Sequence, residues 1–449
     1  MYQRIIVFGL LVSLVFFSAR GFSQNGGNDI AAKSTEGHTG PVLEKLTLSK
    51  AFHTAMTQSP VLKSAAHQLA AEQARVNAPN DGRPNPGLSV EAEDFLGGGE
   101  LRGVDSLQIT TSLSQEVELG KKAAHRRRQR ESAKNLTAIN LEIARQQLRA
   151  DVAMAFLDVL AQQERVKHAK EMVQLAEKTV ATIAAQVEAG RSTGMEQDKA
   201  SVEFTLAQLR EKEAVRDLDS ARVRLSAACG ISDTFFNAVS GDLSVISELP
   251  NLQELVDTAL AHPQLKQSDA FVRLQQATAG IQKGNGVPNV TFDVGFRWNN
   301  ATANPALVAG VQVPLPVFDR NRGNIAAASS DVARAQSDAQ TLAIAIHSEI
   351  VTAYQTLRFE LERLKVLREE ISPSVNDTFL AVAEGYGIGR FGYLDLLDAQ
   401  RTMFEIRTMV LDAMVKYQAA RITLSYTVGI PVSEALFTAS AEPTKETAR

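Results

Sequence analysis

Four short segments of the chain alternate between apolar and polar side chains, as a strand with two different faces does. The alternation is clearest from Val290 to Trp298, where every second side chain is apolar. The pattern predicts strands at about 87–96, 106–117, 289–299 and 306–316. We therefore expect a small β part with four strands.

The two faces of the predicted strands differ in chemistry. Phe292, Phe296 and Trp298 share one face of the third strand. The opposite face of the first and third strands carries charged side chains: Glu91, Glu93, Asp293 and Arg297. Such strands fit a barrel wall between lipid and a wet lumen, or one side of a soluble β-sandwich. The chain offers few further strands to cover the aromatic face, which favours the barrel.

Long stretches with few or no glycine and proline residues predict helices between the strands. They lie at about 121–189, 195–228, 324–384 and 394–426, with shorter helical regions at 46–78 and 252–283. At ~1.5 Å per residue the first would be on the order of 100 Å long. Pro263 should break the 252–283 region, and Pro373 should kink the 324–384 helix.

A heptad seam in the 324–384 helix predicts coiled-coil-like packing, because its apolar residues recur at alternating spacings of three and four. Its members are His347, Ile350, Tyr354, Leu357, Leu361, Leu364 and Ile371. We expect His347 to be packed with the others.

The chain is duplicated with a period near 200, too long for a solenoid repeat. Gly190 and Gly389 lie 199 residues apart, as do Gly230 and Gly429. Ser59–Pro60 likewise corresponds to His262–Pro263. The copies are assigned to 46–248 and 249–430, each with two strands and long helices.

The ends have compositions of their own. Residues 1–24 hold a basic Arg4 followed by an apolar run from Ile5 to Phe17, which predicts a cleaved signal peptide; an N-terminal membrane anchor is the alternative. Residues 25–45 read as a flexible leader, and 431–449 as a disordered tail. No later segment has the length and apolarity of a membrane helix.

Composition and charge argue against several function classes. A net charge of −4 gives no bulk attraction to nucleic acid, and the basic run at 121–130 is expected to lie where the second strand meets its helix. The only cysteine, Cys229, should be a buried helix-end residue. The seven histidines show neither the i,i+4 pairing nor the cysteine partner of a metal site. We expect no catalytic activity, cofactor or metal site.

Four strands are too few for a membrane barrel, and open sheet edges are not tolerated in hydrocarbon. Two chains would give eight strands, whose interior side chains fill. Three chains would give twelve, the first closure with a usable lumen.

Several motifs resemble the TolC family of outer-membrane efflux factors, over nearly all of the mature length. "SQEVELGKK" (114–122) and "PLPVFDRNRGNIAAA" (314–328) resemble the CzcC-like branch that serves heavy-metal cation efflux, and "YLDLLDAQRTM" (393–403) is shared more widely. The resemblance implies a mainly α, TolC-like homotrimer in the cell outer membrane. Its twelve-stranded shared β-barrel would continue into an α-barrel of long coiled-coil helices in the periplasm. It also implies a periplasmic adaptor and an inner-membrane pump of the resistance-nodulation-division (RND) type as partners.

The same resemblance implies roles for residues near the tip turns at Gly190 and Gly389. Asp395 and Asp398 match the acidic residues that narrow the family's periplasmic aperture, where carboxylate rings would select cations. The alternative is that both carboxylates only stabilise a helix N-terminus. Glu196, Tyr386 and Arg390 match a latch of the closed state; the alternative is a solvated tip charge.

These expectations combine into a passive exit duct for heavy-metal cations such as cobalt, zinc, cadmium or copper. A duct for drugs or secreted polypeptides is the nearest alternative, and a periplasmic coiled-coil scaffold without a pore is a remote one. The first tip carries Glu196 and Lys199 where the second carries Asp395 and Asp398. We expect this difference to make the second helix pair the moving gate.

Overall fold

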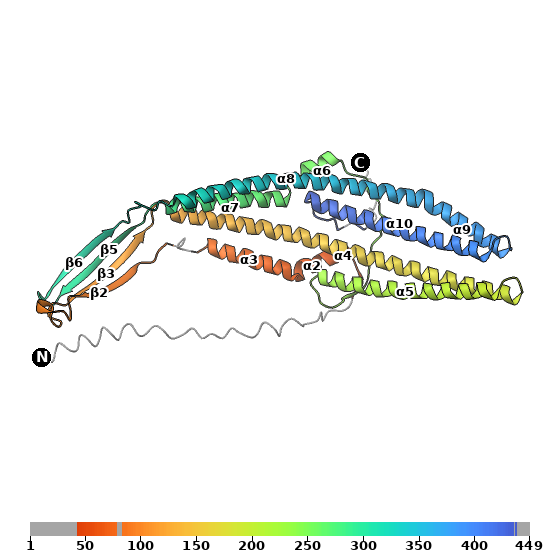
Figure 1. Cartoon of the computed structure of the whole chain (residues 1–449), viewed down its shortest axis with the longest axis horizontal. Coiled ribbons are helices and arrows are strands. Elements are labelled where there is room, and N and C mark those ends of the chain that lie inside the picture. Colours follow the sequence, from red (N-terminus) through yellow and green to blue (C-terminus); the bar gives the residue numbers. More distant parts are fainter. Residues whose placement is uncertain (1–42, 79–82, 435, 438–449) are drawn as a thin grey trace, which may run out of the picture. The chain divides into compact units, whose positions relative to one another are not determined.

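The computed structural model describes residues 43–78, 83–434 and 436–437. The predicted signal peptide and nearly all of the predicted leader lie outside these residues. Long helices dominate the described chain, and a four-stranded sheet accompanies them (Figure 1). The expectation of a mainly α chain with a small β part is confirmed.

The helices follow the sequence pattern closely. The first copy contains α2 (Leu48–Gln58), α3 (Pro60–Val76), α4 (Lys122–Glu188) and α5 (Gly194–Ala228), with a 3₁₀ turn at Gly99–Leu101. The second contains α6 (Leu252–Ala259), α7 (Pro263–Asn285), α8 (Arg322–Lys365), α9 (Ser372–Gly387) and α10 (Tyr393–Val428). Among the described residues, no helix combines the length and the apolar character that crossing a membrane requires.

The predicted kink of the long second-copy helix is a short π-helical segment, η2 (Val366–Ile371), between α8 and α9. The backbone N–H of Ser372 donates to the carbonyl of Leu367, one residue further back than in an α-helix. Pro373 follows within the first turn of α9. A proline ring collides with the carbonyl four residues before it, so a wider turn at this place relieves the conflict.

The four predicted strands form one antiparallel sheet in the order β2-β3-β5-β6. Their bounds are β2 Gly87–Glu93, β3 Gln108–Val117, β5 Val290–Asn299 and β6 Asn304–Gln312. The register places Phe296 opposite Thr111 and Leu307, and Asp293 opposite Ser114 and Gly310. Because side chains alternate across a sheet, the register keeps the aromatic residues of β5 on one face and its charged residues on the other.

The apolar face of this sheet is open within the chain. Phe296 is 68% exposed and Leu307 is 69% exposed. On the other face, Arg297 Nε donates to Thr110 Oγ1 at 3.0 Å, and the hydroxyls of Ser89 and Ser112 lie 2.7 Å apart. The sheet therefore carries its polar network on one face and unpartnered apolar side chains on the other.

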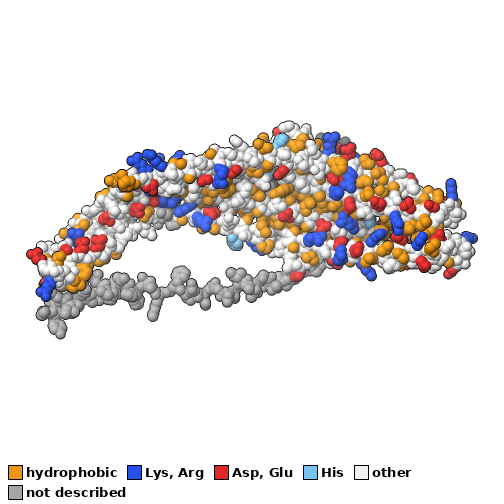
Figure 2. Space-filling model, in the orientation of Figure 1, with side chains coloured by type: hydrophobic (Ala, Val, Ile, Leu, Met, Phe, Trp, Pro, Cys, Tyr) orange, Lys and Arg blue, Asp and Glu red, His pale blue; other side chains and the backbone are white. Residues whose placement is uncertain are grey.

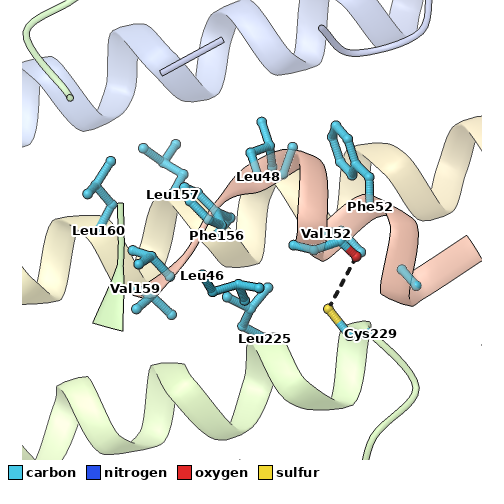
Figure 3. Close-up of a cluster of buried hydrophobic side chains, with 14 of the residues drawn as sticks. Leu46, Leu48, Phe52, Val152, Phe156, Leu157, Val159, Leu160, Leu225 and Cys229 are labelled. Carbon is cyan, nitrogen blue, oxygen red and sulfur yellow. Dashed lines mark hydrogen bonds between the residues drawn. The ribbon is translucent and has the colours of Figure 1, made fainter. Parts of the chain in front are cut away.

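A second sheet was not predicted. β1 (Leu43–Leu46) pairs in parallel with β4 (Phe236–Val239). This corrects the assignment of 25–45 as a flexible leader at its last residues, because 43–45 belong to β1, which ends at the fully buried Leu46. Figure 3 shows Leu46 beside Phe156 and Leu225 in the main core, where Cys229 Sγ lies 3.7 Å from the carbonyl oxygen of Ala51.

The start of the predicted disordered tail is also packed, which corrects that assignment for 431–434 and 436–437. Val432, Leu436 and Phe437 are buried, and the Phe437 ring stacks on Phe156 with centroids 5.6 Å apart. The Asp242 N–H donates to the Phe437 carbonyl at 2.9 Å. Residues 438–449 lie outside the described residues.

The heptad seam is packed as predicted except at His347, with Tyr354 and Ile371 half-buried. Ile350, Leu357, Leu361 and Leu364 are all buried between α8 and its neighbours. His347, which we expected to be packed, is exposed, and Ile346 is buried in its place. An α-helix has 3.6 residues per turn whereas a heptad repeat assumes 3.5, so the buried face gradually rotates away from the heptad positions. At the start of the seam the buried residue is therefore one position earlier than the heptad predicts.

The duplication appears in how four helices end. After α4, α5, α9 and α10 a glycine adopts positive φ: Gly190, Gly230, Gly389 and Gly429. In each case the next residue donates to a carbonyl five residues back, as Arg191 does to Gln186 and Arg390 to Gly385. This is the Schellman termination, which favours glycine because it lacks a Cβ.

Two of these glycines also contact the start of an earlier helix of their own copy. A Cβ at Gly230 would lie 3.0 Å from Cα of Ser59, and a Cβ at Gly429 would lie 2.8 Å from the His262 ring. Ser59 and His262 are the N-caps of α3 and α7, each followed by a proline. The sequence correspondence of Ser59–Pro60 with His262–Pro263 is thus a repeated helix-to-helix contact.

Candidate functional site

The candidate site is the region where α4 turns into α5 and α9 turns into α10. Five buried side chains hold these helices together: Ile183, Ala200, Tyr386, Tyr393 and Leu396. They come from all four helices, so the two predicted tip turns share one small apolar core. Gly190 and Gly389 both lie in open space, since an added Cβ at either would meet no atom within 4 Å.

The first tip has a complete capping box at the start of α5. The Glu196 N–H donates to Thr193 Oγ1 and the Thr193 N–H donates to the Glu196 carboxylate, each at 3.3 Å. The Ser192 hydroxyl also donates to that carboxylate. These bonds satisfy backbone donors that a helix start leaves unpaired.

The second tip uses its acidic residue in a related way. The Asp395 carboxylate accepts from the Gly392 N–H at 2.9 Å, at the third position of α10. Asp395 and Asp398 are both exposed, and their spacing of three places them on one helix face. Asp395 therefore stabilises the start of α10. Asp398 lies one turn further along the helix, beyond the position from which a side chain reaches the backbone N–H groups of the helix start.

The three predicted latch residues lie in the same region, where Ser192 interacts with both Glu196 and Tyr386. Tyr386 donates to Gln186 Oε1 at 2.8 Å, which joins α9 to α4. The Arg390 guanidinium lies 5.8 Å from the centre of the Phe391 ring. Within the described chain, no side-chain hydrogen bond or ion pair joins Arg390 to Glu196 or Tyr386. A latch through Arg390 stays a prediction.

The tip electrostatics keep the two buried tyrosines protonated. Burial raises the pKa of Tyr386, and the nearby Glu196 charge raises it further. Burial and the Glu203 charge likewise raise the pKa of Tyr393. Tyr386 therefore remains a hydrogen-bond donor to Gln186 throughout the ordinary pH range.

Sequence reasoning missed the ion pairs that join the two copies. Arg401 of α10 pairs with Glu203 of α5, and Arg165 of α4 lies 2.8 Å from Asp412 of α10. Next to the first pair, a groove between α4, α5 and α10 is lined by aliphatic, aromatic and polar side chains that include Leu397, Phe404 and Gln400. No signal in a single sequence predicts these pairs, because they depend on how α10 is rotated against α4 and α5.

The structure also places the residues predicted for the membrane sheet. Phe292, Phe296 and Trp298 share the open face of β5, with exposures from 44% to 68%. The basic run begins at the N-terminus of α4, directly after β3, as expected. There Arg126 forms two hydrogen bonds to Glu118, at 2.8 and 2.5 Å, and this pairing lowers the pKa of Glu118.

Cys229 is buried at the end of α5, as predicted. Burial raises the pKa of its thiol to about 12. Among the residues that the structure describes, no group of three or more histidine, cysteine or acidic side chains is arranged to hold a metal ion.

Comparison with known proteins adds sequence and structural relatives. A family model described as "Outer membrane efflux protein" matches residues 51–231 and 255–429. The cobalt-zinc-cadmium resistance protein CzcC of Cupriavidus metallidurans is 30% identical over 381 residues, covering 84% of this chain and 88% of the relative. The nickel-cobalt-cadmium resistance protein NccC of Alcaligenes xylosoxydans xylosoxydans is 27% identical, covering 58% of each chain.

Among solved structures, CusC, which forms a transmembrane channel, aligns with a TM-score of 0.73 at 16% identity. The alignment covers 87% of this chain and 94% of CusC. The predicted TolC-like fold is thereby confirmed.

Proposed function

Because the chain belongs to the outer membrane efflux protein family, we propose that it is the exit duct of a tripartite efflux system for heavy-metal cations. The chain is an outer membrane efflux channel by family. The finer assignment has three parts: a trimeric barrel, a metal cargo, and an adaptor with an RND-type pump as partners.

One observation carries the trimeric barrel: the four-stranded sheet has an open apolar face and two edge strands. β2 and β6 each pair with a single strand of the described chain. In hydrocarbon every backbone N–H and carbonyl needs a partner, so β6 of one chain would pair with β2 of the next. Three chains close a barrel of twelve strands, with Phe292, Phe296 and Trp298 towards lipid and Glu91, Glu93 and Asp293 towards the lumen.

The cargo assignment rests on the relatives. CzcC and NccC are named for resistance to cobalt, zinc, nickel and cadmium, and CzcC matches over most of both chains. The described residues hold no arrangement for a resident metal ion. In this proposal the pump selects the metal, and the duct offers only a carboxylate-lined aperture at Asp395 and Asp398.

The duct works passively and opens at the helix tips. Near the tips, α9 and α10 hold to α4 and α5 through a small core, one tyrosine hydrogen bond and the Arg401–Glu203 pair. Further from the tips, the Arg165–Asp412 and Arg407–Glu171 pairs also join α10 to α4. These contacts are few compared with the main core around Phe156. An opening motion of α9 and α10 would therefore break the tip contacts and keep the main core intact.

A gene deletion with complementation tests the cargo. We expect the deletion strain to lose tolerance to cobalt, zinc or cadmium, and the wild-type gene to restore it. Drug tolerance, measured in the same strain, is the control. Unchanged metal tolerance with lost drug tolerance would assign the duct to drugs instead.

The pore itself is tested by single-channel recording of the purified protein in planar bilayers. We expect discrete conductance steps from detergent-extracted trimers. A freely water-soluble protein without conductance would contradict the duct and support a periplasmic scaffold.

A further inference from the structure

Between β6 and α8 the chain exposes large apolar side chains beside two arginines. Leu315 is 78% exposed, Val317 is 63% exposed and Phe318 is fully exposed. Arg320 and Arg322 follow, and both are exposed. We call residues 314–322 the junction segment. Exposed apolar groups of this size in a fixed segment mark a contact surface.

The backbone of the junction segment is fixed by hydrogen bonds. The Asn321 amide donates to the carbonyl of Gln282 in α7 at 2.7 Å, and the Asn321 N–H donates to Asp319 Oδ1 at 2.8 Å. Arg320 Nε donates to the Pro316 carbonyl at 3.1 Å. The exposure of Phe318 is therefore imposed by a defined loop structure.

The junction segment continues the apolar face of the sheet. Leu307 and Val311 of β6 are more than 60% exposed, and Val313, directly before the segment, is 45% exposed. Figure 2 shows hydrophobic and basic side chains side by side where the sheet meets the helices. Apolar residues that lead from a lipid-facing strand into a basic pair suit the boundary between acyl chains and headgroups.

The first copy shows that the fold does not require this surface. Its corresponding residue, 200 positions earlier, is Glu118 in place of Phe318. Glu118 is mostly buried and bonded to Arg126. In the first copy an ion pair thus holds Glu118, while Val117 and Leu119 beside it are each 41% exposed; in the second copy the corresponding Phe318 is fully exposed.

We propose that the junction segment is a membrane anchor that binds anionic phospholipid in the periplasmic leaflet of the outer membrane. Phe318, Leu315 and Val317 would enter the acyl region, and Arg320 and Arg322 would bind the headgroup phosphate. Arginine suits this partner because its planar guanidinium forms paired hydrogen bonds to phosphate oxygens. A concave surface at this place is lined by Val317, Phe318, Asp319, Arg320, Arg322 and Gly323. The Asp319 carboxylate in this lining accepts the Asn321 N–H. The inference rests on the proposed function, which puts the sheet in the membrane.

Tryptophan quenching tests the anchor and the barrel separately. The chain has a single tryptophan, Trp298, on the sheet. The full-length protein is placed in vesicles that contain phospholipid brominated near the headgroup, and Trp298→Phe/Phe318→Trp is compared with the wild type. We expect both tryptophans to be quenched by the brominated lipid and shielded from aqueous acrylamide.

The outcomes separate the two claims. Quenching of Trp298 without quenching at position 318 overturns the anchor and leaves the duct standing. Protection at position 318 from both quenchers marks a contact between subunits and also overturns the anchor. Absence of quenching at both positions overturns the membrane sheet and the anchor with it.

A second arm tests the choice of headgroup with brominated phosphatidylglycerol against brominated phosphatidylcholine. Each arginine near an anionic surface should favour phosphatidylglycerol by roughly five-fold. Arg320→Gln and Arg322→Gln in the Phe318→Trp background should remove this preference. Arg334→Gln is the matched control, because Arg334 is an exposed arginine of α8 that pairs with Asp331. An equal response of Trp298→Phe/Phe318→Trp, with Arg320 and Arg322 in place, to both lipids would overturn the phosphate site.

Discussion

Asp395 and Asp398 have different environments although they share one helix face. Asp395 accepts a backbone hydrogen bond at the start of α10, and Asp398 lies beyond the reach of the cap. The structure therefore offers a way to separate helix-end stabilisation from aperture charge. A substitution that tests the proposed ring of aperture carboxylates should therefore be made at Asp398.

We predict that Asp398→Asn lowers the preference of the pore for cations without lowering thermal stability. The reason is that an exposed carboxylate outside the cap contributes little to folding. Asp395→Ala should also lose its cap and about 0.5–2 kcal/mol of stability. Reversal potentials in a salt gradient and thermal unfolding measure the two effects. Asp377→Asn, an exposed acid of α9, is the control, and an Asp398→Asn pore with unchanged selectivity would reject the ring.

The helix-ending glycines differ in what surrounds them. All have positive φ, but only Gly230 and Gly429 are in close contact with another element. We predict that Gly429→Ala destabilises the protein more than Gly389→Ala. The left-handed backbone costs both variants about 1–2 kcal/mol, and the collision with His262 adds about 1–3 kcal/mol at position 429. Denaturant unfolding measures the difference, and equal losses would contradict the contact.

His262 links stability to pH. Burial lowers its pKa, although the Glu349 charge acts in the opposite direction, and its Nδ1 accepts from the Gln264 N–H at 3.1 Å. Because its pKa is lowered in the folded state, His262 binds fewer protons in the folded chain than in the unfolded chain as the pH falls. The free energy of unfolding is therefore greatest above about pH 6.5, the ordinary histidine pKa, and decreases below it. We predict that His262→Asn, which can still cap α7, loses less stability than the wild type between about pH 7 and 5. If the stability of His262→Asn and that of the wild type fell equally between about pH 7 and 5, this role of His262 would be refuted.

At the scale of elements, the segment after α10 is part of the main core. Phe437 is 2% exposed and stacks on Phe156 of α4. The segment that follows the second copy thus packs against α4, a helix of the first copy. This contact ties the end of the second copy to the first.

We predict that Phe437→Ala costs about 3–5 kcal/mol, because a buried aromatic side chain leaves a cavity when truncated. Phe95→Ala is the matched control, since Phe95 is 46% exposed beyond β2. Its effect should stay within about 0.5 kcal/mol. Thermal unfolding in detergent compares the two variants. Similar stability in both would show that the segment after Pro431 is not part of the core.

At the scale of the whole molecule, the two copies meet along α4 and α10. Arg165–Asp412 joins these helices away from the tips, and Tyr386–Gln186 joins α9 to α4 at the tips. If α9 and α10 form the moving gate, a bond at the tips should stop opening. A bond at the distant pair should leave opening unaffected.

We predict that a disulfide between Gln186→Cys and Tyr386→Cys reduces channel opening, in a Cys229→Ala background. The control places the disulfide at Arg165→Cys and Asp412→Cys. Conductance is recorded before and after reduction, and opening should return only in the tip variant. Unchanged conductance with the tip disulfide formed would count against the moving second tip.

The strands, helices and helix ends could be predicted from the sequence because each depends on residues that are close together in the chain. Alternation with period two located β2, β3, β5 and β6. The absence of proline and glycine located α4, and Pro373 located the break between α8 and α9. The recurring glycines located the helix ends, including the tips of the candidate site. The resemblance supplied Asp395, Asp398 and the latch residues, whose roles stay predictions.

Only the tertiary structure decided which distant segments meet. β1 pairs with β4 almost 200 residues away, Phe437 reaches Phe156, and Arg401 reaches Glu203. Periodicity states which face of an element is apolar, but it does not state which partner covers that face. His347 illustrates the limit, because a drift of one residue in the packed stripe exchanged it for Ile346. The sequence by itself therefore determined the elements and their faces, and the packing of the helices determined the partners.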